Sequence, residues 1–230
     1  MNKLELTALS GRIAGLLDHS CSLEAVYDEL SKSILTLGGA RLTLELVDEI
    51  LVCVTDSGLH LKSLKIAFSN IDRIPESVLE TVSLERLLLM GNRIRRVHDG
   101  IGRLKNLTSL RMNHNEISRL PSSICELPML EHLELQSNRL SSLPGGIGKL
   151  SKLRVLCLRH NRLYSVPGSF KDLDTLTHLY LEENLFQHMP KAIITLPSLR
   201  LLHISCNQLS HVDMKKYRDL MSGRGIKFIY

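Results

Sequence analysis

The sequence predicts an α/β fold in which short repeats stack into a curved solenoid. One parallel sheet is expected on the concave side, and irregular or 3₁₀ turns on the convex side. Three observations lead to this prediction: apolar residues recur every 23 residues, an asparagine recurs in the same phase, and the prolines fall at fixed places of the same period. Self-similarity at a fixed period of about 20–50 residues is the sequence signature of a repeat architecture.

The repeat begins at Leu61 and runs through seven copies without an insertion. Leucine or another apolar residue stands at the first, fourth, sixth and eleventh positions of each copy. Asparagine stands at the ninth position of six copies, and the first copy has Ser69 there: Asn92, Asn115, Asn138, Asn161, Asn184 and Asn207. All seven prolines keep to the same phase, at the fifteenth or twenty-second position: Pro75, Pro121, Pro128, Pro144, Pro167, Pro190 and Pro197.

Each residue type has a physical reason for its place in the repeat. The alternation of apolar and polar residues over the fourth to sixth positions is the period of a short strand buried on one face. Asparagine donates and accepts hydrogen bonds, so it can satisfy backbone groups of its own turn and of the neighbouring turn. Because proline fixes φ and lacks an N–H group, it disfavours a long helix on the outer side.

The consensus Leu-x-x-Leu-x-Leu-x-x-Asn-x-Leu-x-x-Leu-Pro-x-x-Ile-x-x-Leu resembles the leucine-rich repeat. Its 23-residue, proline-bearing form is similar to the repeats of the Ras-group proteins, meaning the Ras suppressor and its plant intracellular relatives. The resemblance extends over residues 61–212 and implies a curved solenoid of seven repeats with its sheet on the concave side. It does not reach residues 1–60.

Residues 1–60 are expected to form an N-terminal cap of helices plus one or two strands, because an open stack exposes leucines at its ends. Apolar residues follow one helical stripe in residues 9–17 and another in residues 26–37. Ser22 is the expected N-cap of the second helix, and Gly38 with Gly39 its expected end.

Residues 42–54 alternate well enough to predict one or two strands, with a hairpin around Asp48 and Glu49. A separate binding module in residues 1–40 is the competing interpretation of this end of the chain. About 40 residues bury too little apolar surface to fold alone, which favours the cap.

Residues 213–230 are expected to cap the other end of the stack. A short helix is predicted over 214–221, a turn at 223–225, and a last strand over 226–230, close to where a further repeat would place one. This strand would pair the final edge of the sheet, and Lys227 would discourage further pairing.

Composition limits the class of protein. The 230 residues include 43% hydrophobic and 23% charged residues and carry a formal net charge of +5, which excludes a chain that is disordered throughout. No apolar run approaches the roughly 18 residues of a membrane span, and no secretory signal is expected. Five cysteines without a CxxC spacing favour a reducing, cytoplasmic location.

Function is expected on the concave face, where the side chains between the strand leucines point away from the core. A row of chemically varied side chains on a parallel sheet suits recognition of a protein surface. The expected partner-binding residues are Lys65, Phe68, Arg86, Leu88, Met90, Arg111, Glu134, Arg159, His178, Tyr180 and His203.

Two groups of these residues stand out. Apolar anchors flanked by arginines are typical of interface hot spots, and residues with both apolar and hydrogen-bonding parts offer contact area as well as polarity. The first group is Phe68, Leu88 and Met90 beside Arg86 and Arg111, and the second is His178, Tyr180 and His203.

Structural explanations compete with these assignments. Arg111 with Glu134, and Arg159 with Glu182, fit cross-strand ion pairs on a solvated sheet. The N-terminal cap could also fold over Phe68.

Residues 73–111 contain eight basic against four acidic side chains, which indicates an acidic partner surface or a solvated flank. Few aromatic residues are available for base stacking and no nucleic-acid motif is present, so no nucleic-acid partner is expected.

No pattern for a metal ion, a cofactor or catalysis is found, so none of the three is expected. His114 and His160 share a column but lie two repeats apart, roughly 10 Å, too far to share a zinc ion. Cys157 and His178 could pair across neighbouring strands, but an open sheet provides neither oxyanion donors nor protection from water. The glycines at 145, 146 and 148 lack the ending of a phosphate-binding loop and indicate a turn.

These observations predict a non-enzymatic adaptor or scaffold that binds a protein partner on its concave face. The Ras-group resemblance implies a small GTPase or its effector as that partner, in cytoplasmic signalling. The alternative is a regulatory or substrate-recognition subunit of a phosphatase or ubiquitin ligase complex, whose terminal segments bind the enzyme. The oligomeric state is not fixed by the sequence, and a monomer is favoured.

Overall fold

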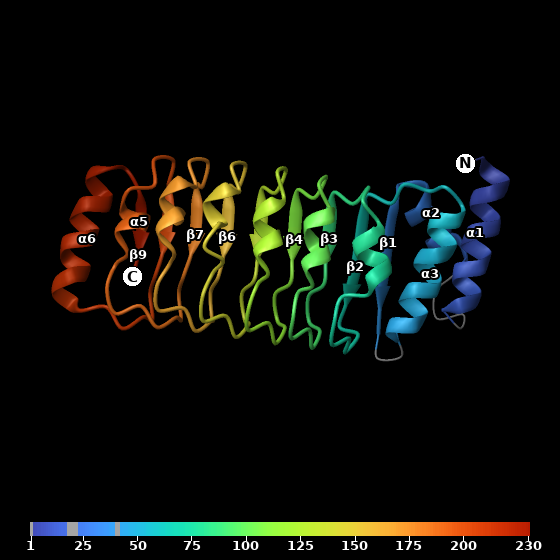
Figure 1. Ribbon diagram of the computed structural model, residues 1–230, viewed down its shortest axis with the longest axis horizontal. Coiled ribbons are helices and arrows are strands. Elements are labelled where there is room, and N and C mark those ends of the chain that lie inside the picture. The colour runs from blue at the N-terminus through green and yellow to red at the C-terminus, as the bar shows by residue number, and fades with distance from the viewer. Residues whose placement is uncertain (1, 18–22, 40–41) are drawn as a thin grey trace.

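The structure, a computed structural model, describes residues 2–17, 23–39 and 42–230. Within these residues one open parallel sheet contains nine strands in the order of the sequence. Figure 1 shows the strands and helical turns following one another along the length of the molecule. The strands are β1 (Ile34–Gly38), β2 (Ser63–Ala67), β3 (Arg86–Leu88), β4 (Ser109–Arg111), β5 (His132–Glu134), β6 (Val155–Cys157), β7 (His178–Tyr180), β8 (Leu201–His203) and β9 (Lys227–Ile229). Strands and helical turns alternate along the chain, so the fold is the predicted α/β solenoid.

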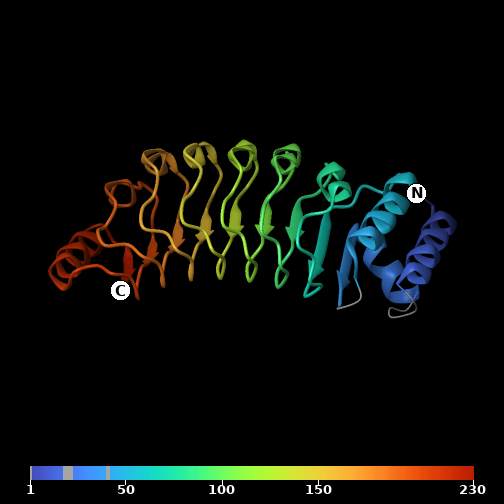
Figure 2. The same cartoon turned by 60° about the horizontal axis from the view of Figure 1, so that its bottom comes forward.

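Short helical turns form the outer side of the solenoid, opposite the strands (Figure 2). Four of the six are 3₁₀ turns, and all are short because the repeat leaves room for only one or two turns. Proline is the N-cap of α4, η2, η4 and α5, where its fixed φ starts the turn. They are α4 (Glu76–Glu80), η1 (Asp99–Arg103), η2 (Ser122–Glu126), η3 (Ile147–Lys149), η4 (Gly168–Asp172) and α5 (Lys191–Ile194). In η1, where the sequence has histidine instead of proline, the Nδ1 atom of His98 accepts a hydrogen bond from the Gly100 N–H at 3.0 Å.

The hydrophobic core runs between the sheet and the outer turns along the whole stack. The central leucine of each repeat strand, such as Leu87 or Leu110, is fully buried. Because one repeat cannot bury its own apolar edge, every repeat depends on its neighbours for this burial.

The asparagines form a ladder of hydrogen bonds beside the core. In Asn115, the Nδ2 group donates to the carbonyls of Leu89 at 2.9 Å and Met112 at 3.0 Å. Its Oδ1 atom accepts from the backbone N–H of Ile94 at 3.0 Å. Each amide thereby joins its own turn to the preceding repeat, as the sequence predicts, and satisfies backbone groups that would otherwise be buried without partners.

The residue before the ninth position of each repeat, which is Ser69 in the first copy and asparagine in the other six, has a left-handed backbone conformation. The φ angles lie between 53° and 67°, although only one of the seven residues is a glycine. This column, which the sequence analysis missed, consists of Phe68, Gly91, His114, Ser137, His160, Glu183 and Cys206.

The N-terminal cap contains α1 (Lys3–Leu16), α2 (Leu23–Ser31) and α3 (Leu44–Asp56) in addition to β1. The prediction of strands over 42–54 was wrong, because this segment is the helix α3, which starts at the N-cap Thr43 and contains the supposed hairpin residues Asp48 and Glu49. Its apolar residues have helical rather than alternating spacing, and the buried ones are Val47, Ile50, Leu51, Cys53 and Val54.

The second predicted helix is also shorter than expected. It ends at Ser31, and Ser33 turns the chain with a φ of 57° into β1, which pairs with β2. This segment forms a strand instead of a helix because β2 would otherwise have an unpaired edge. Its sequence also suits a strand, since the buried Leu35 and Leu37 alternate with the exposed Thr36 and Gly38. Gly38 therefore ends a strand instead of a helix, while Ser22 lies outside the described residues.

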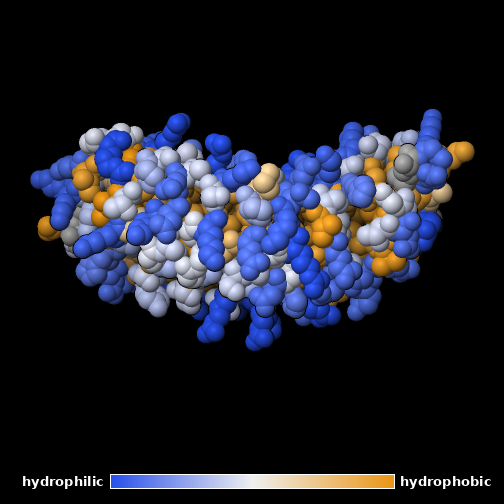
Figure 3. All heavy atoms as spheres, turned by 45° about the horizontal axis from the view of Figure 1, so that its top comes forward, coloured by the Kyte–Doolittle hydropathy of each residue, from blue (hydrophilic) through white to orange (hydrophobic). Residues whose placement is uncertain are grey.

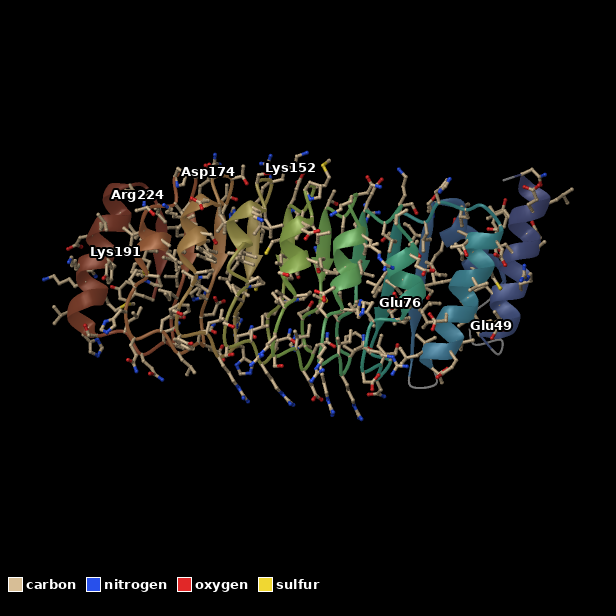
Figure 4. The ribbon with its side chains drawn as sticks, in the orientation of Figure 1. Glu49, Glu76, Lys152, Asp174, Lys191 and Arg224 are labelled. Carbon is tan, nitrogen blue, oxygen red and sulfur yellow. The ribbon has the colours of Figure 1, made fainter. Side chains whose placement is uncertain are left out.

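The C-terminal end has the predicted order of a helix, a turn and a strand. Helix α6 (His211–Gly223) is longer than predicted, and β9 pairs with β8. The guanidinium of Arg224, labelled in Figure 4, donates hydrogen bonds to the carbonyls of Ile194 and Leu196 and thereby ties the turn to the last repeat. No helix in the described residues has both the length and the apolar character needed to cross a membrane.

Candidate functional site

Two columns of side chains line the concave face, because the parallel register aligns equivalent positions of successive strands. The strand leucines between the columns point into the core, so the column residues lie on the opposite face. The central column is Lys65, Leu88, Arg111, Glu134, Cys157, Tyr180 and His203. The second column is Ser63, Arg86, Ser109, His132, Val155, His178 and Leu201. This alignment is the one that the repeat phase predicts.

The apolar residues expected in the early repeats lie close together. Leu88 is the last residue of β3, Met90 lies two residues beyond it, and Phe68 directly follows β2. The Phe68 N–H donates to the Met90 carbonyl at 3.1 Å. The Phe68 side chain is 68% exposed, so the described part of the N-terminal cap does not fold over it. We call Phe68, Leu88 and Met90, with Arg86 and Arg111 beside them, the early-repeat patch.

The predicted cross-strand ion pairs are present. The Nε atom of Arg111 lies 3.3 Å from Glu134 Oε1. The Nε atom of Arg159 lies 3.9 Å from Glu182 Oε1, and its Nη2 atom lies 3.0 Å from Oε1 of Glu183, the following residue. The Arg159–Glu183 pair is exposed on both sides and contributes only about 0–1 kcal/mol to stability. The side chains of Arg111 and Arg159 remain 43% and 54% exposed, so both are accessible to a partner.

Glu182 and Glu183 organise the concave face of the late repeats. Glu182 is buried, and its Oε1 atom lies 3.2 Å from His203 Nδ1. The other ring nitrogen of His203 is 2.9 Å from Ser205 Oγ, so both are engaged. The hydrogen bond from Arg159 lowers the pKa of Glu183. Glu183 was not predicted, because it lies in the turn before the repeat asparagine and not in a strand column. Glu182 was predicted only as the partner of Arg159, and its contact with His203 was missed.

The second expected group lies on β7 and β8, where Tyr180 is in register with His203. The Nδ1 atom of His178, in the neighbouring column, lies 2.9 Å from Thr177 Oγ1. The three side chains are half-buried and share the concave face with Arg159.

Cys157 has the properties of a structural thiol. Burial raises its pKa to about 11, so the thiol is protonated at neutral pH and is a poor nucleophile. Nothing in the contacts of His178 or His203 provides a base for it. Within the described part of the chain, no group of three or more His, Cys, Asp or Glu residues is placed to hold a metal ion.

On the face drawn in Figure 3, charged and polar side chains dominate, and the apolar atoms form small separate areas. A groove of about 1140 Å³ lies between the start of α3 and the outer turns of the first three repeats. Its lining includes Arg73, Arg96 and Arg119. Arg73 and Arg96 belong to the basic segment 73–111 noted in the sequence, whereas Arg119 lies beyond it. That the three arginines share one position of successive repeats was not predicted.

The strand register, the asparagine ladder and the proline-capped outer turns together define a leucine-rich repeat protein. A family model described as leucine rich repeat matches residues 82–140, 128–186 and 151–209, which together span more than half of the sequence. The chain therefore belongs to the leucine-rich repeat family.

Comparison with known proteins adds the following findings. No curated protein matches the chain. Among solved structures, 426 chains match, including a leucine-rich repeat protein of Leptospira interrogans that is 24% identical, with a TM-score of 0.48. The match covers 85% of this chain and 59% of that one, so the chain spans less than two thirds of the length of this neighbour.

Proposed function

We propose that the protein is a non-enzymatic adaptor that binds a partner protein on its concave face, with the early-repeat patch as the centre of the contact. The observation that carries this proposal is the exposed ring of Phe68 beside Leu88, Met90 and two arginines. Apolar anchors beside arginine are characteristic of interface hot spots. Leucine-rich repeat proteins generally mediate protein–protein interactions, which supports the same conclusion.

The rest of the concave face would extend this contact. Lys65 and Glu134 continue the central column, and the late repeats offer polar and aromatic groups that suit a broad protein surface. These late-repeat residues are Arg159, His178, Tyr180 and His203.

We propose a small GTPase or its effector as the partner, in cytoplasmic signalling. The support is the 23-residue, proline-bearing repeat, which resembles the Ras-group proteins, and the two arginines, which suit an acidic surface. The described cysteines are all free thiols, in keeping with a reducing compartment: Cys53, Cys125, Cys157 and Cys206. In this proposal residues 61–212 are the recognition unit, and residues 1–60 and 213–230 are its caps.

The test is a triple variant with Arg86→Glu, Arg111→Glu and Leu88→Ala. Affinity capture with mass spectrometry on the wild type identifies a candidate, and its direct binding is then measured by calorimetry. We expect the triple variant to bind at least about a hundredfold more weakly, because it removes an anchor and reverses two charges. All three side chains are at least partly exposed, so the melting temperature should stay within a few degrees.

A matched control carries Arg93→Glu, Arg162→Glu and Leu185→Ala, which changes the same residue types outside the two concave columns. It should bind like the wild type. Equal affinity of the triple variant and the wild type would rule out the concave face. If the captured partner is neither a small GTPase nor a GTPase effector, and the triple variant weakens its binding, the adaptor role stands. The proposed role in GTPase signalling would then be wrong.

The second candidate is a regulatory or substrate-recognition subunit of a phosphatase or ubiquitin ligase complex. It is favoured by exposed apolar side chains at both ends of the solenoid, where an enzyme could bind. Leu4 and Val212 are each 82% exposed, and Val52 is 51% exposed. Exposed apolar side chains can mark a protein-binding surface, so the ends of the solenoid could bind an enzyme while the concave face binds another protein.

Point substitutions distinguish this candidate better than deletion of residues 1–40, which would remove β1 from the sheet. The variant with Leu4→Glu and Val52→Glu changes exposed side chains only. If two partners co-purify and this variant loses only one of them, the subunit role is supported. If both partners remain, the N-terminal end is not the enzyme-binding site.

A further inference from the structure

The groove beside α3 places three arginines in one row. Arg73, Arg96 and Arg119 are 23 residues apart, so they occupy the same position of the first three repeats. The next two repeats have serine at this position, so the row is confined to the groove. The groove lies on the outer-turn side of the solenoid, near Glu76, which Figure 4 labels where α4 lies beside α3.

Arg96 and Arg119 stand side by side on the groove, at the same position of neighbouring repeats. Their backbones form a parallel bridge, so their side chains leave the chain in the same direction, about 4.8 Å apart. Neither has an ion pair with any described residue, whereas the adjacent Arg95 pairs with Glu116 at 3.4 Å. Like charges directly opposite each other on neighbouring strands are destabilising. An anion between the two guanidinium groups would relieve this repulsion.

The other charged side chains of the groove form ion pairs or accept hydrogen bonds. Arg73 lies 3.6 Å from Asp72, and Glu76 lies 3.6 Å from Arg103. Asp48 accepts a hydrogen bond from Ser77, and Asp99 accepts one from Ser123 at 3.5 Å. The groove is therefore not a uniformly basic track, but a pair of free arginines with carboxylates nearby.

We propose that this groove binds a phosphorylated segment of a partner protein, with the phosphate between Arg96 and Arg119. A phosphomonoester carries about two negative charges and three acceptor oxygens, which match two guanidinium forks; a single carboxylate carries only one charge. The apolar lining, including Ile74, Val97 and Leu120, provides contacts for the residues next to the phosphate. Recognition of phosphorylated motifs by arginine clusters is a known mode of peptide binding.

Other polyanions fit the groove less well. The row is only three arginines long, and the lining contains no phenylalanine, tyrosine or tryptophan on which successive nucleic-acid bases could stack. The carboxylates Asp48, Glu76 and Asp99 would repel an extended anionic surface such as a membrane or a nucleic-acid backbone. They would instead favour a basic residue beside the phosphate.

The test uses a library of peptides of about seven residues with a central phosphoserine, and the same library without phosphate. Binding to the full chain is measured by fluorescence anisotropy. The variant is Arg96→Gln with Arg119→Gln, and the matched control is Arg93→Gln with Arg162→Gln. The control removes the same charge from exposed arginines that also lack a described ion pair.

We expect the wild type and the control to prefer the phosphorylated library at least about tenfold, and the groove variant to lose this preference. Its melting temperature should not fall, because the substitutions remove a repulsion. The triple variant of the early-repeat patch should keep the preference, so this site is tested independently of the concave face.

Three results would overturn the proposal. One is equal binding of the two libraries by the wild type. Another is equal loss in the groove variant and the control, which indicates non-specific attraction. The third is binding of a single-stranded oligonucleotide or of phosphatidylserine vesicles that depends on the two arginines and is not displaced by the phosphopeptides.

Discussion

The aromatic ring of Phe68 occupies the space that a Cβ atom would need on residue 91, the equivalent position of the next repeat. Both residues are left-handed, with φ angles of 54° for Phe68 and 67° for Gly91. Five other residues of the column adopt this conformation with a side chain, so φ alone does not require the glycine. Gly91 is explained by the ring that lies on it, since any side chain there would displace Phe68 from the early-repeat patch.

The first prediction concerns this contact. Gly91→Ala should destabilise the protein by about 1–3 kcal/mol, because the methyl group displaces the ring and the left-handed conformation costs about 1–2 kcal/mol. The free energy of unfolding in urea measures the effect. In a Phe68→Ala background the same substitution should cost less, since only the backbone contribution remains. Gly145→Ala, at a glycine with open space around its Cβ position, is the control and should be nearly neutral. An equal cost of Gly91→Ala in both backgrounds would disprove the contact.

The asparagine ladder leads to the second prediction. Asn138→Ala should cost about 2–4 kcal/mol, because the side chain donates to the Met112 carbonyl at 2.9 Å and accepts from the Ile117 N–H at 2.9 Å. Its loss leaves these buried groups without partners. Asn106→Ala is the matched control, since that exposed amide makes a single hydrogen bond, to Val82, and should cost at most about 1 kcal/mol. Comparable losses in the two variants would show that the ladder is not a main source of stability.

The third prediction concerns Glu183. Its pKa is lowered chiefly by the hydrogen bond from Arg159, so its contribution to stability is present above its ordinary pKa. That contribution is lost as the pH falls through the lower pKa of the folded state. Arg159→Gln should raise the pKa of Glu183 towards its ordinary value and reduce the acid-dependent loss of stability. Carboxyl NMR titration measures this, and Arg162→Gln serves as the control. An unchanged pKa in the Arg159 variant would show that another group sets it.

The fourth prediction separates a structural thiol from a catalytic one. Because burial raises the pKa of Cys157 to about 11, iodoacetamide should label it much more slowly than the exposed Cys206 at neutral pH. The labelling rate of Cys157 should rise about tenfold per pH unit towards pH 10, as measured by peptide mass spectrometry. Faster labelling of Cys157 than of Cys206 near pH 7 would indicate an activated nucleophile and reopen the enzymatic hypothesis.

The sequence predicts the repeats better than the caps, for a physical reason. In the repeats seven copies fix the phase, so the columns through Leu88 and Arg111 follow from counting alone. In residues 26–37 no second copy exists, and a short apolar run fits a helix as well as a strand. The strand β1 forms because β2 offers an edge, which is a property of the folded neighbour and not of the segment itself.

The parts of the surface that the sequence did not reveal lie in the turns. Most of the early-repeat patch could be predicted because Arg86, Leu88 and Met90 alternate with the buried Leu87 and Leu89. The pairing of Arg96 with Arg119 depends on a bridge outside the main strands. The left-handed column could not be expected either, since phenylalanine and glutamate do not signal a positive φ.

The asparagine ladder has a mechanical consequence. Each amide ties its own coil to the preceding one, so detaching a coil removes a support from its neighbour. When the two termini are pulled apart, the coils should therefore unfold one after another, starting from an end. The extension would lengthen in equal increments, each set by the contour length of one coil.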